Sequence, residues 1–373
     1  MSRVLRAGLV GCGSLSQRGV LPHLSEPDAR ERVELVAVAD AVLERAQASA
    51  ARWGIPHAFA SVEQLLAGAD VDLVLVITPI GHHFANAMAA VAAGKHVYVQ
   101  KAMTVTTAES DALLQAAARA GVKLAAAPGF VLFPFTAQIR AAAGQIGAIY
   151  SCYTYTHGFG HEHEAIRGGT AVTEAIDPSW YYRAGAGPLP DVTVYSLQLL
   201  TSVLGPVRRV TALANTRVPE RTWRGQTIVI GVPDNNAILM ELHSGTIAVA
   251  AGTDSRGSQI SPWGGMELFG KSGTLTITEV EMNSGYPVAF LLNGAMQTAQ
   301  LADQPWLRGA HLTIEEPHVY ADIMDLVDAI EYSRAPRATG EQARHVVEII
   351  ECARRAVDTG QTQDLHTSFA PED

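Results

Sequence analysis

The stretch "GLVGCGSLS", residues 8–16, decides the fold class of this chain. It follows an apolar run typical of a buried strand, and it opens a helical pattern. In such a unit the first glycine permits a tight turn, the second lets a pyrophosphate approach the backbone, and a small third residue (here Ser16) lets the helix pack closely. The pattern predicts a dinucleotide-binding loop made by Gly11, Gly13, Ser14 and Leu15.

An acidic residue ends the second predicted strand, "VELVAVAD", at the distance from the loop that a dinucleotide-binding unit requires. A carboxylate at this position, Asp40, accepts hydrogen bonds from both ribose hydroxyls and repels a 2′-phosphate. The next two residues are apolar, and no arginine follows until Arg45. We therefore expect NAD rather than NADP as the cofactor. A tight turn that binds no ligand is the alternative.

Two further predicted strands, "VDLVLVIT" and "HVYVQ", end in residues suited to a cofactor cleft. Thr78 and Pro79 stop the first of them, and Gln100 and Lys101 end the second. The carboxyl ends of parallel strands gather at one edge of a sheet, and ligands bind outside that edge. We expect all four residues at the cofactor cleft, with the Lys101 amine pointing into it. A solvated lysine in a loop is the alternative.

The pattern of predicted secondary structure changes near the middle of the chain. Residues 4–125 alternate short apolar runs with helical patterns, which predicts βαβ units and a parallel sheet. From about residue 151, β-rich runs punctuated by Gly, Pro, Asn and Asp predict an open, mostly antiparallel sheet. Helices are expected at about 318–333 and 340–358, the second with the capping pattern Thr339-x-x-Gln342. The prediction is an α/β protein with a Rossmann domain, 1–127, and a second α/β domain for substrate binding and oligomerisation, 128–373.

Length and composition restrict the class of protein. The 373 residues exceed what one ordinary core holds, and only 17% of them are charged. A net charge of −10 is the wrong sign for nucleic-acid binding. No apolar run is long enough for a membrane span, and the short stretch before the first predicted strand leads us to expect no signal peptide. Three scattered cysteines fit a reducing compartment, so a cytoplasmic location is expected.

Several segments, in their order along the chain, resemble the glucose–fructose oxidoreductase/inositol dehydrogenase family (Gfo/Idh/MocA). They include "GLVGCGSLSQRG", "TPIGHHFANAMAAVAAGKHVYVQKAMT" and "GAGPLPDVTVYSLQLLTSVLGPVRRVTA". The resemblance implies a Rossmann domain followed by a domain whose open sheet covers the nicotinamide and often mediates oligomerisation. It implies hydride transfer between a nicotinamide and a sugar, a cyclitol or a derivative, by a homo-oligomer such as a dimer or tetramer. His83 matches a frequent family histidine at the cofactor site.

The resemblance also implies the catalytic residues, with departures. Lys101 is retained, but Ala102 follows it where proline is usual. Asp191 matches the aspartate of a second-domain motif, and Tyr195 replaces the usual histidine four residues later. An ammonium lowers the pKa of a nearby phenol, and residues four apart on a helix share a face. Lys101 and Tyr195 are therefore predicted to transfer the proton, in either order, with Asp191 assisting. A packed core aromatic and a helix cap are the alternatives for Tyr195 and Asp191.

A histidine-rich stretch, "THGFGHEHEAIRGGT" at residues 156–170, invites three interpretations: a solvated loop, substrate contact or a metal site. Zinc sites use closely spaced histidines, but ordinarily on a rigid element, and this stretch is rich in glycine. No metal is predicted. Aromatic faces and polar donors suit a sugar ring, although simple packing explains them equally well. The candidate substrate-binding residues are His157, His161, His163, Trp180 and Arg183.

Three functions follow as hypotheses. The first is an NAD-dependent oxidoreductase that interconverts a secondary hydroxyl of a carbohydrate or cyclitol and its ketone. The alternative is an NAD-dependent glycosidase, which oxidises a ring hydroxyl of a glycoside, eliminates the glycosidic group, adds water and reduces the ketone again. The third is a non-catalytic NAD sensor or partner subunit.

Overall fold

A computed structural model describes residues 3–255, 264–280, 287–298 and 305–371. The chain forms two compact units. The first comprises residues 1–129, 164–178 and 306–340, and the second comprises 130–163, 179–305 and 341–373. The predicted division between residues 127 and 128 lies close to the first passage of the chain between the units. The chain returns to the first unit twice more.

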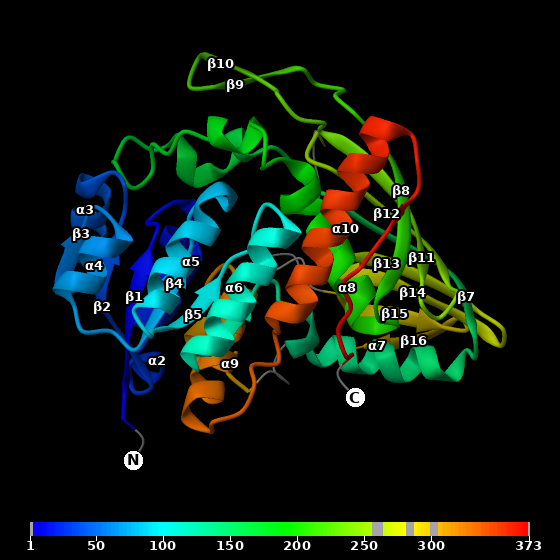
Figure 1. Cartoon of the computed structure of the whole chain (residues 1–373), viewed down its shortest axis with the longest axis horizontal. Coiled ribbons are helices and arrows are strands. Elements are labelled where there is room, and N and C mark those ends of the chain that lie inside the picture. The colour runs from blue at the N-terminus through cyan, green and yellow to red at the C-terminus, as the bar shows by residue number, and fades with distance from the viewer. Residues whose placement is uncertain (1–2, 256–263, 281–286, 299–304, 372–373) are drawn as a thin grey trace. The chain divides into compact units, whose positions relative to one another are not determined.

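The first unit is built on a six-stranded sheet with the order β3-β2-β1-β4-β5-β6 (Figure 1). Each neighbouring pair is parallel. The sheet is the predicted Rossmann sheet, and its strand order reverses between β1 and β4, where such sheets bind ligands. The strands are β1 (Leu5–Val10), β2 (Val33–Ala39), β3 (His57–Phe59), β4 (Leu73–Val76), β5 (His96–Val99) and β6 (Leu124–Ala126).

The helices of this unit pack around the sheet, and two of them end at glycines, Gly54 and Gly121, in left-handed conformation. Among the described residues, no helix is long and apolar enough to cross a membrane. The helices are α1 (Leu21–Ser25), α2 (Pro27–Arg30), α3 (Leu43–Trp53), α4 (Val62–Gly68), α5 (His83–Ala92), α6 (Thr107–Ala120) and α9 (Pro317–Glu331).

Helix α9 was expected to close the second domain, but it packs in the first unit. Its buried Asp322 accepts a hydrogen bond from the hydroxyl of Tyr98 on β5 at 3.1 Å and another from the backbone N–H of Gly129 at 3.0 Å. Burial raises the pKa of Asp322 well above its usual value, and both donors oppose that rise. These polar contacts anchor the helix beside β5 and β6.

The second unit contains a nine-stranded sheet with the order β16-β15-β14-β13-β7-β12-β11-β8-β17. Among the described strands of this sheet, only β12 and β7 pair in parallel, so the sheet is mostly antiparallel, as predicted. The strands are β7 (Ile149–His157), β8 (Val207–Asn215), β11 (Asn235–Leu242), β12 (Ile247–Thr253), β13 (Gly265–Gly270), β14 (Gly273–Val280), β15 (Pro287–Leu292), β16 (Ala295–Thr298) and β17 (Gln363–Asp364).

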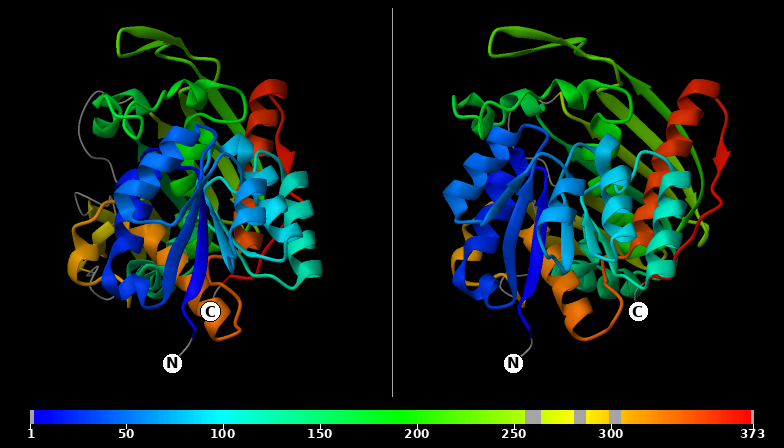
Figure 2. Two further views of the ribbon diagram at one scale, coloured as in Figure 1. Left: turned by 90° about the vertical axis from the view of Figure 1, so that its left-hand side faces the viewer. Right: turned by 60° about the vertical axis from the view of Figure 1, so that its left-hand side comes forward.

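Three helices accompany this sheet: α7 (Pro134–Gln145), α8 (Val194–Leu204) and α10 (Gly340–Thr359) (Figure 2). Side chains along β11 alternate between buried and solvent-facing, because one face of the sheet packs on helices. Gln342, the last residue of the expected capping pattern, contacts helix α8. Its side-chain amide donates to the hydroxyls of Thr201 at 3.1 Å and Ser202 at 2.9 Å, which joins α10 to α8.

One of the β-rich runs expected in the second half, "QTIVIGV" at residues 226–232, does not join the large sheet. It forms a hairpin of β9 (Glu220–Trp223) and β10 (Gln226–Val229) that projects beyond the large sheet (Figures 1 and 2). Apolar residues of this region pack with the short helix η6 (Ser179–Tyr182). The cluster consists of Tyr181, Tyr182, Ile228 and Ile230, with Trp180 and Trp223 against it.

Candidate functional site

The glycine-rich loop has the shape that a pyrophosphate requires. Gly11 has φ +99°, and a Cβ there would lie 2.4 Å from the carbonyl oxygen of Ile77. A Cβ on Gly13 would meet nothing within 4 Å, so the loop is open at that position. The hydroxyl of Ser16 donates to the Gly11 carbonyl at 2.6 Å, which explains how serine fits where glycine or alanine is usual. The loop therefore fits a dinucleotide phosphate.

Asp40 directly follows β2 and lies beside this loop, where a ribose would be recognised. Its carboxylate accepts from the backbone N–H groups of Cys12 at 2.9 Å and Val42 at 2.8 Å. Arg45 pairs with it at 3.0 Å, so the structure adds a cation that the sequence prediction had left aside. Asp40 is thus held in place, and its charge is partly balanced by Arg45.

A segment from the middle of the chain lies on the glycine-rich loop. The Ser14 hydroxyl donates to Glu164 at 2.7 Å, and Nε of Arg167 donates to the same carboxylate oxygen at 2.8 Å. Arg45 also donates to the carbonyl of Val172 at 3.1 Å. Sequence reasoning read this stretch as part of the second domain and missed its contacts, because they join residues far apart in the chain.

The turns after β4 and β5 are tied together by His83. Its ring nitrogens lie 2.6 Å from the Thr78 carbonyl and 2.8 Å from the Ala102 carbonyl. Complete burial lowers the pKa of His83 to about 4, although both carbonyls oppose this. These two contacts let His83 position both turns. Its contact with the cofactor stays a prediction.

Lys101 is half-buried at the end of β5. Its backbone N–H donates to the side-chain carbonyl of the buried Gln100 at 2.6 Å. Thr78 accepts from the Asn86 amide at 3.4 Å, and Pro79 leads into the short helix η2 (Ile80–His82). These residues lie at the carboxyl ends of neighbouring strands, the edge at which the cofactor was expected.

Asp191 and Tyr195 belong to the second unit and lie in consecutive segments. Asp191 is in a π-helical turn, η7 (Leu189–Thr193), and Tyr195 is in the first turn of α8. The expected single helix is therefore irregular at this point. Both side chains are largely buried, and the Tyr195 ring packs edge-on against Phe130, with ring centroids 5.9 Å apart.

One residue of the histidine-rich stretch, His161, contacts Asp191. Nε2 of His161, in the turn η4 (His161–His163), lies 3.2 Å from Oδ2 of Asp191. The Tyr181 ring meets the His161 ring edge-on at 4.2 Å, and Trp180 lies 6.1 Å away. Of the other candidates, His157 ends β7 beside Tyr155, whereas His163 and Arg183 are exposed.

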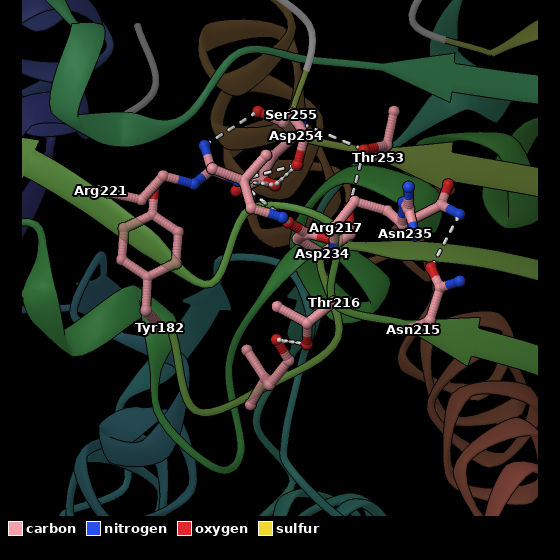
Figure 3. Close-up of polar contacts among 12 residues, drawn as sticks. Tyr182, Asn215, Thr216, Arg217, Arg221, Asp234, Asn235, Thr253, Asp254 and Ser255 are labelled. Carbon is pink, nitrogen blue, oxygen red and sulfur yellow. Dashed lines mark hydrogen bonds and ion pairs between the residues drawn. The ribbon is translucent and has the colours of Figure 1, made fainter. Parts of the chain in front are cut away.

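A buried ionic cluster lies next to η4, and nothing in the sequence pointed to it. Arg221 on β9 lies 3.0 Å from Glu162, 3.0 Å from Asp254 and 3.6 Å from Asp234. Figure 3 shows Arg221 reaching Asp254 and Ser255 with the Tyr182 ring beside it. We call Arg221, Glu162, Asp234 and Asp254 the Arg221 cluster.

Burial and the contacts with Arg221 have opposing effects on the carboxyl groups of this cluster. Burial raises the pKa of Asp254 to about 6 despite the Arg221 charge. Burial also acts to raise the pKa of Glu162, but hydrogen bonds from Tyr182 and Arg221 outweigh it and hold that pKa below its usual value. Within the described ranges, no group of three or more His, Cys, Asp or Glu side chains has the arrangement of a metal site.

Two of the curated proteins that this chain matches over part of its length are named for activities on sugars. The chain is 31% identical over 212 residues to dTDP-3,4-didehydro-2,6-dideoxy-alpha-D-glucose 3-reductase of Streptomyces violaceoruber, covering 56% of this chain and 57% of the relative. It is 35% identical over 157 residues to D-xylose 1-dehydrogenase (NADP(+)) of Hypocrea jecorina, covering 39% and 40%. These two matches thus span 57% and 40% of the relatives' own lengths.

A full-length likeness comes from a solved structure. Levoglucosan dehydrogenase in complex with NADH and L-sorbose superposes with a TM-score of 0.81 over 98% of this chain and 100% of that chain, at 18% identity. At that identity the likeness shows the fold alone. Nothing in these three comparisons indicates the glycosidase alternative.

Two family models match in sequence. Residues 5–127 match the oxidoreductase family with an NAD-binding Rossmann fold, and residues 136–276 match the GFO/IDH/MocA C-terminal domain. The matched ranges contain Gly11, Gly13 and Asp40 in one model and Asp191 and Tyr195 in the other. The chain therefore belongs to the Gfo/Idh/MocA family of NAD-binding oxidoreductases.

Proposed function

We propose that this protein is an NAD-dependent dehydrogenase or ketoreductase that acts on a secondary hydroxyl of a carbohydrate or cyclitol. The observation that carries the proposal is the open glycine-rich loop beside Asp40, at the switch point of a Rossmann sheet. The family membership supports it, as does the reductase and dehydrogenase activity that its partial relatives are named for.

The first unit supplies the residues that would hold NAD. Gly11, Gly13, Ser14 and Leu15 form the phosphate loop, and Asp40 would accept from the ribose hydroxyls. Thr78, Pro79, Gln100 and Lys101 line the strand ends beyond it, and His83 fixes the two turns. Bound NAD would supply the hydride acceptor for oxidation of the alcohol.

The hydroxyl proton must also leave when hydride leaves carbon. Lys101 and Tyr195 are the proposed proton-transfer pair, since an ammonium lowers the pKa of a neighbouring phenol. Asp191 is the proposed assisting carboxylate. The proposed substrate-binding residues offer the aromatic face and the polar groups that a sugar ring binds. They are Trp180 and His161, the exposed His163 and Arg183, and His157 at the end of β7.

Purified protein mixed with NAD and a panel of sugars, anhydrosugars and cyclitols tests this function. The proposal expects formation of reduced cofactor with at least one member of the panel. Lys101→Met should lower kcat by at least about 100-fold, the contribution of one acid–base group. The absence of reduced cofactor with every sugar and cyclitol would contradict the proposal.

We also propose that the protein is a homo-oligomer joined through the nine-stranded sheet. One face of this sheet exposes five large apolar side chains on adjacent strands, and such faces usually bind a partner. The residues are Tyr153, Leu213, Leu239, Ile247 and Phe269. Light scattering should give a dimer or tetramer, and Leu239→Arg should yield monomers. A monomeric wild type would contradict the proposal.

A further inference from the structure

The hydrogen bond between His161 and Asp191 joins two residues thirty positions apart, on the turn η4 and the π-helical turn η7. We propose that His161, held by Asp191, is the group that receives the substrate's hydroxyl proton, and that the Arg221 cluster positions it for this task. The inference rests on the proposed oxidoreductase function, and it identifies the proton acceptor of that same site.

The geometry assigns the roles of the two imidazole nitrogens. Nε2 lies 3.2 Å from a carboxylate oxygen of Asp191, so Nε2–H donates to that oxygen. In a neutral imidazole, one nitrogen then carries the proton and the other, Nδ1, is the acceptor. The carboxylate also stabilises the imidazolium that forms when Nδ1 takes a proton, as in other pairs of histidine and aspartate.

The surroundings of the pair favour proton transfer. The rings of Tyr181 and Trp180 pack against His161, and the side chains of His161 and Asp191 are 22% and 12% exposed. A partly dry site strengthens the attraction between imidazolium and carboxylate, while the exposed part lets the proton leave to solvent. Tyr181 stays neutral, because burial, followed by the charge of Asp191, raises the pKa of its hydroxyl well above the usual value.

The other charged groups near η4 are already engaged. Glu162, beside His161 in sequence, is bonded by Arg221 at 3.0 Å and by the Tyr182 hydroxyl, and its side chain is 1% exposed. His163 lies 3.5 Å from Glu162 and is mostly exposed. Asp191 is therefore the carboxylate that accepts the hydrogen bond from His161 and stabilises its protonated form.

Arg221 fixes the turn that carries His161. Its second terminal nitrogen donates to Asp254 at 3.0 Å and to Ser255 at 2.8 Å, directly after β12. The guanidinium thus connects η4 to the end of the large sheet through Glu162. Arg221 and Glu162 are positioning residues: they hold the histidine in place through the backbone of η4.

The proposed step balances as follows. The O–H bond of the substrate breaks, and its proton, which the proposed Lys101 and Tyr195 help to release, ends on Nδ1 of His161. The C–H bond of the carbinol would break with transfer of its electron pair as hydride, for which bound NAD would be the acceptor, and the carbinol would become a ketone. The imidazolium then releases its proton to solvent. Ketone reduction runs the same path in reverse.

Nitrogen NMR of ¹⁵N-histidine-labelled protein without cofactor tests the pair independently of activity. The His161 signals, assigned by their loss in His161→Ala, should show the neutral ring protonated at Nε2. Glu162→Gln keeps the volume of the side chain but weakens its bond to Arg221, and it should give a mixture of tautomers. The exposed His243, in the same unit, should be unchanged in both proteins. A wild-type His161 ring protonated at Nδ1 would overturn the proposal.

Kinetics tests the proton role with the sugar that the wild type oxidises. His161→Ala should lower kcat at least about 100-fold, and added imidazole should restore part of the rate. The affinity for NAD should stay within about twofold, and His243→Ala should behave like the wild type. A His161→Ala enzyme with wild-type kcat would refute this inference and leave the oxidoreductase function intact. A wild type that oxidises no sugar or cyclitol would overturn both, whatever the NMR spectrum shows.

Discussion

Replacing Arg221 by alanine should be among the most destabilising single changes in the second unit. The substitution leaves Glu162, Asp254 and Asp234 buried without their shared cation, and their side chains are at most 1% exposed. Removing one partner of a buried ion pair costs about 3–5 kcal/mol. We expect a loss of that size in the free energy of unfolding at pH 8.

The loss in free energy of unfolding should depend on pH, and the titration of Asp254 determines whether it grows or shrinks as the pH rises. The pKa of Asp254 is about 6 in the folded protein against an ordinary value of 3.8. A carboxyl whose pKa is raised on folding contributes stability that is present below the ordinary value and is lost as the pH rises through about 6. Without Arg221 the pKa of Asp254 should rise further, so the acid is neutral at pH 5. The destabilisation should therefore be smaller at pH 5 than at pH 8.

Denaturant unfolding followed by tryptophan fluorescence measures the loss in free energy of unfolding. Trp180 and Trp223 report on this region because they pack against the hydrophobic cluster that contains Tyr182, whose ring lies beside Arg221. Arg209→Ala is the matched control: it removes a half-exposed arginine paired with Glu241, and such surface pairs contribute about 0–1 kcal/mol. A loss for Arg221→Ala no larger than that of the control would refute the reasoning. A loss that grows as the pH falls would refute it too.

Three further predictions concern the first unit. Asp40→Ser should admit NADP, since it removes the anion and releases Arg45 to pair with a 2′-phosphate. The wild type should bind NAD at least about a hundredfold more tightly than NADP, and titration of both cofactors should give a smaller ratio for the variant. Gly13→Ala should keep the melting temperature but weaken NAD binding at least about tenfold, because its Cβ points into open space. Gly11→Ala should lower the melting temperature itself, because of its positive φ and the Ile77 carbonyl. Unchanged melting of Gly11→Ala, or unchanged cofactor affinity of the other two variants, would contradict this account of the loop.

The Rossmann sheet could be predicted from the sequence because its signals are local. Apolar runs such as "VELVAVAD" coincide with β2, and the glycine spacing fixes the loop that follows β1. The strand-rich second half was also predicted, since its runs are separated by turn residues. Helix α9 was placed in the wrong unit because an apolar helix face does not say which sheet it covers. Asp322 on that face was the available signal, since a buried carboxylate needs donors nearby.

The candidate site was harder to predict, because its contacts connect distant positions. Asp191 and Tyr195 were found through their resemblance to a family motif. The bond from His161 to Asp191 and the Arg221 cluster depend on how η4, β9 and the end of β12 meet in the folded chain. Arg221 looks like an ordinary strand residue in the sequence, and no spacing connects it to Glu162, Asp234 or Asp254.

Transfer of deuterium from a substrate carbon to the cofactor tests the central claim most directly. The protein is incubated with NAD and the sugars and cyclitols of the panel, each deuterated at its secondary carbinol positions, and the nicotinamide is analysed by mass spectrometry and NMR. The account predicts one deuterium at C4 of the reduced nicotinamide and a ketone in the product. Reduced cofactor without deuterium, or no reduced cofactor with any substrate, would contradict it.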